Sequence, residues 1–247
     1  MNSATSFARV ALALCLFVVS AANAESEEGR VAGAIAKRFP GSTPEHIAPS
    51  PVPGIYEVSI DGDLIYVTPD ARFAFAGRLF DLERRADLTE PVVGTLRLKS
   101  LGSVPEEKMI IFEPDGEATH TITTFTDVDC PYCRKMHKEI DQLTGAGVRV
   151  RYLLYPRTAV GSPSYLKAVS VWCSDDRKEA MTQAKLGETP EPRDCPNPVI
   201  EHMQLANRLG LTGTPMTITD SGERLNGYLP ADSLVAGLEA AKQTPSQ

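Results

Sequence analysis

The chain has 247 residues, with 25 lysines and arginines against 32 aspartates and glutamates, which gives a formal net charge of −7. An excess of acid argues against nucleic acid as a partner, because binding to phosphates needs clustered basic side chains. The length exceeds the usual size of one domain, roughly 100–150 residues, and so predicts two units of unequal size.

Residues 1–24 have the pattern of a secretory signal peptide. Arg9 precedes an apolar run from Val10 to Val19, and Ala22-Asn23-Ala24 supplies the small residues of a cleavage site. The apolar run has about half of the roughly 20 residues that cross a bilayer, so a membrane anchor is the weaker interpretation. We expect an exported protein that is not membrane-inserted.

Residues 25–85 are predicted to form a small N-terminal unit rich in β-strands. The pattern indicates a helix around residues 31–39 and strands over 55–60, 64–67 and 72–75. A unit of about 60 residues buries too little surface to be stable alone. We expect it either to dimerise through an open sheet edge or to pack on its own C-terminal unit.

Residues 83–106 combine charged side chains with Pro91, Gly94, Gly102 and Pro105. Proline and glycine both disfavour the interior of a helix. We therefore expect a linker over residues 86–106.

Residues 107–247 alternate between strand and helix patterns. A helix is expected from Cys133 to Gly145, with Tyr132, Met136, Ile140 and Leu143 on one face. Ser162 and Pro163 can begin another helix, and Gly210 can end a third. The other expected elements are strands over 109–112, 121–125 and 148–154, helices over 165–173 and 199–209, a hairpin of 216–219 and 224–228, and a helix over 231–242.

The segment Cys130-Pro131-Tyr132-Cys133 lies where a buried strand gives way to a helix. Thiol exchange needs a thiolate, and the unpaired N–H groups of a first helical turn stabilise an anionic sulfur. We expect Cys130 to attack a substrate disulfide and Cys133 to resolve the mixed disulfide. Arg134 and Lys135 favour the thiolate while Asp127 and Asp129 oppose it, so the sign of the net effect stays open.

A zinc site and an inert local bridge are the weaker interpretations of this cysteine pair. Zinc wants four ligands, and no second Cys-x-x-Cys or His pair follows at ligand spacing. We expect neither a metal nor another cofactor. His137 is expected on the exposed side of the helix, and we assign no role to His46, His120 or His202.

Cys173 and Cys195 lie 22 residues apart and bound a polar, proline-rich segment. Neither belongs to a Cys-x-x-Cys, which favours a structural disulfide over a second redox pair. Such a bridge would contribute about 3 kcal/mol.

Thr214-Pro215 precedes an expected strand, an unusual place for a proline unless its peptide bond is cis. Beside the cysteine pair, Thr214 and Pro215 would present backbone groups to an extended substrate, and we expect Tyr132 to contact it too.

These features together make the chain resemble the DsbC family of periplasmic disulfide isomerases. The matching segments are Phe125-Thr126-Asp127, Cys130-Pro131-Tyr132-Cys133, the pair Cys173 and Cys195, Gly213-Thr214-Pro215, Arg151-Tyr152-Leu153, Pro156-Arg157, Trp172-Cys173 and Gly227-Tyr228. The resemblance implies an α+β protein of the periplasm, a homodimer joined by its N-terminal domains, with a C-terminal thioredoxin fold that carries a helical insertion.

The resemblance also implies a function. A cleft would bind misoxidised exported proteins with chaperone-like activity, and a membrane thiol reductase of the DsbD type would keep Cys130 and Cys133 reduced. It further implies that the bridge between Cys173 and Cys195 is structural and that Pro215 is cis.

Three features depart from the family's pattern. Pro131 stands where its isomerases usually have glycine and is the form of the DsbG relatives, and Asp129 replaces a neutral residue. The family's helical linker here contains Pro91, Gly94 and Gly102, which predicts a bent or shorter one. Two alternatives to an isomerase stay open: a DsbG-like reductase that protects single cysteines from overoxidation, and a non-catalytic holdase.

Overall fold

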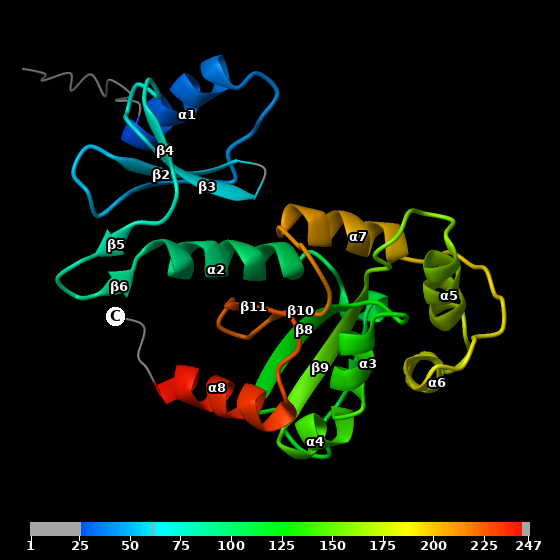
Figure 1. Cartoon of the computed structure of the whole chain (residues 1–247). Coiled ribbons are helices and arrows are strands. Elements are labelled where there is room, and N and C mark those ends of the chain that lie inside the picture. The colour runs from blue at the N-terminus through cyan, green and yellow to red at the C-terminus, as the bar shows by residue number, and fades with distance from the viewer. Residues whose placement is uncertain (1–25, 61, 244–247) are drawn as a thin grey trace, which may run out of the picture.

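The computed structural model describes residues 26–60 and 62–243, so the predicted signal peptide lies outside the described residues. A small N-terminal unit, a long helix and a larger mixed unit follow one another along the chain, as Figure 1 shows. The predicted α+β class is confirmed. In the two described ranges, no helix is long and apolar enough to cross a membrane.

The N-terminal unit packs one helix on a small antiparallel sheet. Helix α1 (Glu27–Arg38) begins at Ser26, whose side chain accepts a hydrogen bond from the Gly29 amide, and it buries Val31 and Ile35. The sheet has the order β1-β2-β3-β4, which leaves β1 and β4 at its edges. Its strands are β1 (His46–Pro49), β2 (Tyr56–Ile60), β3 (Asp63–Val67) and β4 (Ala74–Ala76).

A short hairpin of β5 (Phe80–Asp81) and β6 (Ala86–Asp87) leads into helix α2 (Thr89–Leu101). Most of the expected linker is thus a 13-residue helix, which Pro91 and Gly94 do not interrupt. Pro91 lies in the first turn, where its missing N–H has no helical acceptor, and Gly102 caps the C-terminal end.

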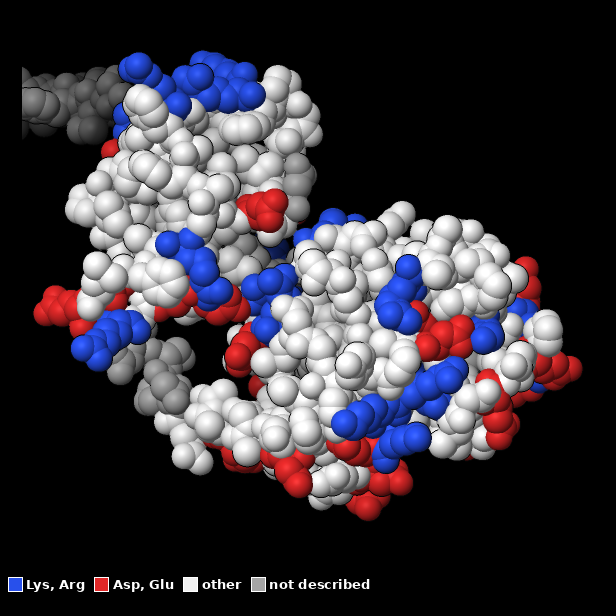
Figure 2. Space-filling view, in the orientation of Figure 1, with Lys and Arg blue, Asp and Glu red and all other residues white. Residues whose placement is uncertain are grey.

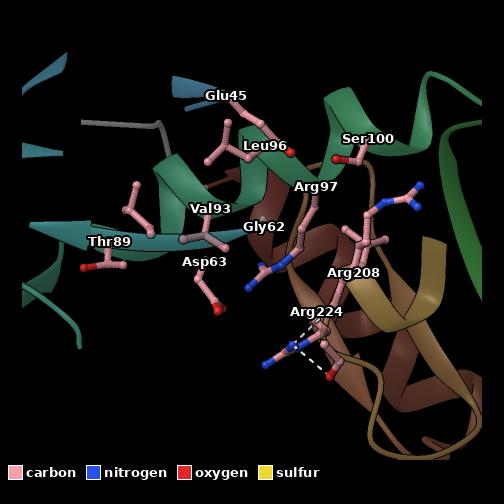
Figure 3. A pocket seen from close by; sticks show the side chains of 13 residues that line it. Glu45, Gly62, Asp63, Thr89, Val93, Leu96, Arg97, Ser100, Arg208 and Arg224 are labelled. Carbon is pink, nitrogen blue, oxygen red and sulfur yellow. Dashed lines mark hydrogen bonds between the residues drawn. The ribbon is translucent and has the colours of Figure 1, made fainter. Parts of the chain in front are cut away.

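Helix α2 is docked on the C-terminal unit. The backbone of Gly94 lies against Gly222, and the guanidinium of Arg97 donates to the Gly222 carbonyl at 3.0 Å. Figure 3 shows Arg97, Arg208 and Arg224 in a pocket lined by the N-terminal unit, α2 and the C-terminal unit. No cysteine is among the residues that line this pocket.

The C-terminal unit is built on a mixed sheet of order β11-β10-β8-β9-β7. Strands β8 and β9 are parallel, whereas β7, β10 and β11 run antiparallel to their neighbours. Strand β8 is almost wholly buried at the centre. The strands are β7 (Ile110–Phe112), which follows the short helix η1 (Glu106–Lys108), β8 (His120–Thr126), β9 (Val148–Leu154), β10 (Met216–Ile218) and β11 (Arg224–Asn226).

Helices surround this sheet, and most lie where the sequence predicts them. The expected helix over 133–145 is divided into two, and Tyr132 does not share its buried face but is 63 % exposed. Ser162 caps its helix as expected. The helices are α3 (Pro131–His137), α4 (Ile140–Gly145), α5 (Pro163–Trp172), α6 (Arg177–Leu186), α7 (Val199–Arg208) and α8 (Ala231–Gln243).

Helix α6 was not expected, because its sequence is polar and is followed by a proline-rich segment. Its boundaries are nevertheless encoded locally. The Asp176 side chain accepts hydrogen bonds from the Lys178 and Glu179 amides, and Gly187 closes the C-terminal end in the left-handed conformation. The helix packs against α3 and α5.

Candidate active site

Cys130 and Cys133 lie at the junction between β8 and α3. The buried strand β8 ends at Thr126, a turn of three residues follows, and Cys130 is the N-cap of α3. Pro131 occupies the first helical position, where a missing N–H costs no hydrogen bond. Both cysteines are free thiols, and Cys133 faces the interior with 1 % exposure.

The segment before β10 reaches the same place from the other side. Strand β10 pairs with β8 so that Met216 lies opposite Phe125, which brings Thr214 and Pro215 beside the end of β8. The Thr214–Pro215 peptide bond is cis. The Cys130 thiol donates to the Thr214 carbonyl oxygen at 3.2 Å, and the two residues are 84 positions apart.

Cys130 is buried in this structure, whereas thiol exchange with a substrate needs an exposed sulfur. Cys130 is only 1 % exposed, and Thr214, which lies against its sulfur, is buried as well. Between the two cysteines, Pro131 and Tyr132 are both exposed, Tyr132 by 63 %. Attack on a substrate disulfide therefore needs the Cys130 sulfur to be more exposed than it is in this structure.

The folded environment of Cys130 decides whether its pKa is raised or lowered, which the neighbouring charges in the sequence leave open. Burial raises the pKa of Cys130, but hydrogen bonds from the Thr214 side chain, from Cys133 and from the Tyr132 amide outweigh burial and lower it below the ordinary value. The Thr214 hydroxyl has no other hydrogen-bond partner among the described residues. The first turn of α3 and Thr214 thus favour the thiolate.

The two acidic neighbours oppose that thiolate less than the sequence suggests. Burial raises the pKa of Asp127, but hydrogen bonds from the Asp129 and Arg157 amides, the Arg157 guanidinium and the Ser164 hydroxyl lower it overall. Asp129 forms ion pairs with Arg134 at 3.1 Å and Lys167 at 2.9 Å. Each carboxylate is therefore held by a cation of its own.

Cys133 has the opposite character from Cys130. Burial raises its pKa, while the positive charge of Lys185 and hydrogen bonds from Thr126 and the Asp127 backbone act against burial without overcoming it. Lys185 belongs to the unexpected helix α6 and is 1 % exposed. No sequence signal places this lysine near the cysteines, because the contact depends on how α6 packs on α3.

His137 is buried, so its expected place on the exposed side of the helix is wrong. It is 3 % exposed and hydrogen-bonds to the Tyr152 hydroxyl at 3.2 Å and the Thr182 hydroxyl at 3.0 Å. Burial lowers its pKa to about 4, with a further contribution from Lys185. His137 lies four residues after Cys133 and so shares the buried face of α3 with Cys133 and Met136.

Cys173 and Cys195 are joined by a disulfide at the end of α5 and beyond α6. Helix α6 lies within the loop that this bond closes. Among residues 26–60 and 62–243, no group of three histidine, cysteine or acidic side chains is placed to hold a metal ion.

Comparison with known proteins agrees with this geometry. Residues 105–242 match the family model of a thioredoxin-like domain, and residues 19–90 match that of the disulfide bond isomerase protein N-terminal domain. The chain is 30 % identical to the thiol:disulfide interchange protein DsbC of Haemophilus influenzae, over 92 % of this chain and 97 % of that protein.

Two further relatives extend the comparison. The chain is 32 % identical to DsbC of Dickeya dadantii over 78 % of this chain and 79 % of that protein. The crystal structure of a disulfide interchange protein from Neisseria gonorrhoeae matches with a TM-score of 0.51 and 28 % identity, covering 57 % of this chain and all of that one. The chain therefore belongs to the DsbC family of thiol:disulfide interchange proteins, enzymes with a thioredoxin-like domain.

Proposed function

We propose that this protein isomerises non-native disulfides in exported proteins, with Cys130 as the attacking cysteine and Cys133 as the resolving one. The observation that carries the proposal is the position of Cys130, at the N-cap of α3 and against Thr214, with a lowered pKa. A thiolate formed there at neutral pH attacks disulfides faster than an ordinary thiol does.

Isomerisation then follows by thiol exchange. The Cys130 thiolate attacks one sulfur of a substrate disulfide, the substrate S–S bond breaks, and the second substrate sulfur leaves as a thiolate. That thiolate attacks another substrate disulfide, and the last sulfur released in the substrate attacks the mixed disulfide and frees Cys130. If the substrate stalls, Cys133 attacks the Cys130 sulfur of the mixed disulfide. The Cys130–Cys133 bond forms, and the substrate is released with its cysteine reduced.

Contacts with the substrate fall to the residues around Cys130. Thr214 offers its backbone beside the sulfur, and the exposed ring of Tyr132 offers an apolar surface. Pro215 follows Thr214, and its carbonyl accepts a hydrogen bond from the Gly227 amide at 2.9 Å, which holds this segment next to Cys130. An extended substrate segment can hydrogen-bond to such a backbone without any particular sequence. This suits an enzyme that acts on many misoxidised proteins.

We also propose that the protein is a homodimer joined through its N-terminal sheet. Strand β4 is an edge strand whose residues are all exposed, and an open edge can pair with a second copy. Exposed apolar side chains follow along this segment: Phe73, Phe75, Phe80 and Leu82. Figure 2 shows basic side chains gathered at the top of the N-terminal unit, with few charges across the middle of its visible face.

The proposed domains and location complete this assignment. Residues 25–85 would form the dimerisation domain, 86–106 the connection that contains α2, and 107–247 the catalytic domain with α5 to α7 as its helical insertion. Residues 1–24 would direct export to the periplasm, where disulfides persist. A membrane reductase of the DsbD type would return the two active-site cysteines to the dithiol, with Cys173–Cys195 left intact as a structural bond.

Refolding of a scrambled multi-disulfide protein tests the function. The reduced enzyme should restore the substrate's activity in catalytic amounts, Cys130→Ala should abolish the restoration, and Cys133→Ala should leave part of it. No restoration by the reduced enzyme, or full restoration by Cys130→Ala, would refute the isomerase. Suppression of aggregation that survives loss of both cysteines without any redox activity would favour a holdase.

Pro131 favours a second candidate, a reductase of sulfenylated single cysteines. Cys130 would attack the sulfenic acid and release water, and Cys133 would then release the reduced substrate cysteine. Rates on a sulfenylated substrate and on a scrambled one, measured side by side, separate the two activities. The reductase is preferred if Pro131→Gly lowers the first rate and raises the second.

A further inference from the structure

Lys185 is a buried cation beneath the cysteine pair. Its side chain is 1 % exposed, and its Nζ donates to the Thr126 hydroxyl at 2.6 Å and to the Asp127 carbonyl at 2.7 Å. Both acceptors are uncharged, and within the described ranges no carboxylate forms an ion pair with this lysine. Burial of an ammonium without a paired anion costs folding free energy, so a lysine at this position indicates a role beyond packing.

Thr126 stands between this cation and the resolving cysteine. Its hydroxyl accepts from Lys185 and hydrogen-bonds to Cys133, and the Asp127 backbone also contacts both residues. The charge of Lys185 lowers the pKa of Cys133, and a Cys133 thiolate in turn raises the pKa of Lys185, which burial has brought down to about 8. The two charges therefore stabilise each other.

Several titratable or charged groups face Lys185, and apart from the two cysteines none of them is free to serve as its anion at neutral pH. The Asp127 carboxylate is held by Arg157, and burial keeps His137 and Tyr152 neutral. The facing groups are Asp127 after β8, Cys130, Cys133, Arg134 and His137 on α3, and Tyr152 on β9, whose ring lies 6.0 Å from the ammonium. Once Cys130 is bound in a mixed disulfide, the Cys133 thiolate is the anion that can form next to Lys185.

We propose that Lys185 is a positioning residue that supplies the positive charge for the Cys133 thiolate in the resolving step. The inference rests on the proposed function, because it concerns the second half of the same exchange. Cys133 loses its proton, and its thiolate attacks the Cys130 sulfur of the mixed disulfide. The Cys130–Cys133 bond forms as the bond to the substrate breaks, the enzyme dithiol is oxidised by two electrons, and the departing substrate thiolate takes up the proton.

The two halves of the exchange can be timed separately in the full chain. Reduced protein is mixed with the aromatic disulfide dithiobis-nitrobenzoate, and each released thiolate is followed by its absorbance. The first release reports attack by Cys130. The second, whose rate does not depend on reagent concentration, reports attack by Cys133 on the mixed disulfide.

Lys185→Met replaces the buried ammonium with an apolar side chain of similar length. The second release should slow about tenfold at pH 7, and its pH midpoint should rise by roughly one unit, since one pKa unit is a tenfold change in thiolate. The first release should change less than the second. Lys185→Arg keeps the charge and should hold the pH midpoint closer to that of the parent protein.

Lys178→Met is the matched control, because it removes a lysine from the exposed side of the same helix. It should alter neither release. If Lys185→Met does not fold, Thr126→Val removes the hydroxyl between the two groups and should slow the second release in the same direction. An unchanged rate and pH midpoint of the second release in the folded variant would overturn the role of Lys185.

Failure of the proposed function gives a different result. In that case the first release of the parent protein would be no faster than the reaction of free cysteine. A fast first release with a second release insensitive to Lys185 would refute only the role of the lysine.

Discussion

The Thr214 hydroxyl lies buried against Cys130 with no other partner among the described residues. The register of β10 on β8 places it there, with Met216 opposite Phe125. A hydroxyl without a competing acceptor can donate fully to a thiolate when one forms. Thr214 is thus suited to stabilise the charged form of Cys130.

Thr214→Val should raise the pKa of Cys130 and slow its alkylation at neutral pH by about tenfold, because one hydrogen bond to a charged group is worth about 1.5–3 kcal/mol. The rate of alkylation by iodoacetamide as a function of pH checks this. Thr217→Val is the control, since the Thr217 hydroxyl pairs with Thr124 and not with a cysteine. Equal rates for Thr214→Val and the parent protein would contradict the role of the hydroxyl.

Asp127 makes stability depend on pH in a stated direction. Its pKa is lowered in the folded protein, so its contribution is complete above the unfolded value of about 3.9 and is lost as the pH falls through the folded pKa. Asp127→Asn should reduce the free energy of unfolding at pH 7 by about 1–3 kcal/mol and flatten its decline in acid. Urea unfolding at pH 7 and near pH 3 measures both.

Asp115→Asn serves as the comparison, because Asp115 is exposed. It should unfold like the parent protein at both pH values. A parallel decline in acid for Asp127→Asn and the parent protein would show that the Asp127 carboxylate does not carry this dependence.

Much of the site was predictable because its signals are local. The cysteine spacing, the strand before it, the proline at the start of α3 and the Thr214-Pro215 pair are all legible in the sequence. The effect of the nearby charges on the Cys130 thiolate was not predictable. In the sequence Asp127 and Asp129 are unpaired anions, whereas in the structure Arg157 and Lys167 form ion pairs with them. Both partners are about 30 or more residues away in the chain.

The docking of α2 depends on two glycines that meet between the units. An added Cβ at Gly222 would overlap the backbone of Gly94, and Gly222 also has a φ of +83°. Gly222→Ala should therefore destabilise the protein by about 1–3 kcal/mol more than the conformational cost alone. Thermal unfolding of Gly222→Ala and of Gly161→Ala measures the difference.

Gly161→Ala isolates the conformational cost. Gly161 has a φ of +84°, and nothing lies within 4 Å of an added Cβ. It should lose roughly 1–2 kcal/mol from the left-handed backbone. Equal losses for Gly161→Ala and Gly222→Ala would contradict the close packing of α2 on the C-terminal unit.

The linker shows why local rules mislead at an interface. Pro91, Gly94 and Gly102 each disfavour a helix interior, but they occupy its first turn, its contact with Gly222 and its C-cap. Pro91 and Gly102 lie at the ends of the helix, where a helix breaker costs little. Gly94 lies inside it, where its lack of a side chain allows close packing on Gly222. None of this can be read from composition.

Removal of the disulfide by Cys173→Ser with Cys195→Ser should lower the free energy of unfolding by about 3 kcal/mol, the cost of opening a loop of this length. Fluorescence of Trp172, the single tryptophan, follows unfolding in urea. Isomerase activity should persist at temperatures where the variant is folded. Loss of activity in the folded variant would instead give this bond a part in the reaction.

Trapping of the mixed disulfide tests directly whether Cys130 is the attacking sulfur. In Cys133→Ser the resolving thiol is absent, so a scrambled substrate should accumulate as a covalent adduct, and mass spectrometry of its peptides should find the link at Cys130. Cys130→Ser should yield no adduct under the same conditions. An adduct at Cys133 in Cys130→Ser, or none at Cys130 in Cys133→Ser, would contradict Cys130 as the attacking sulfur.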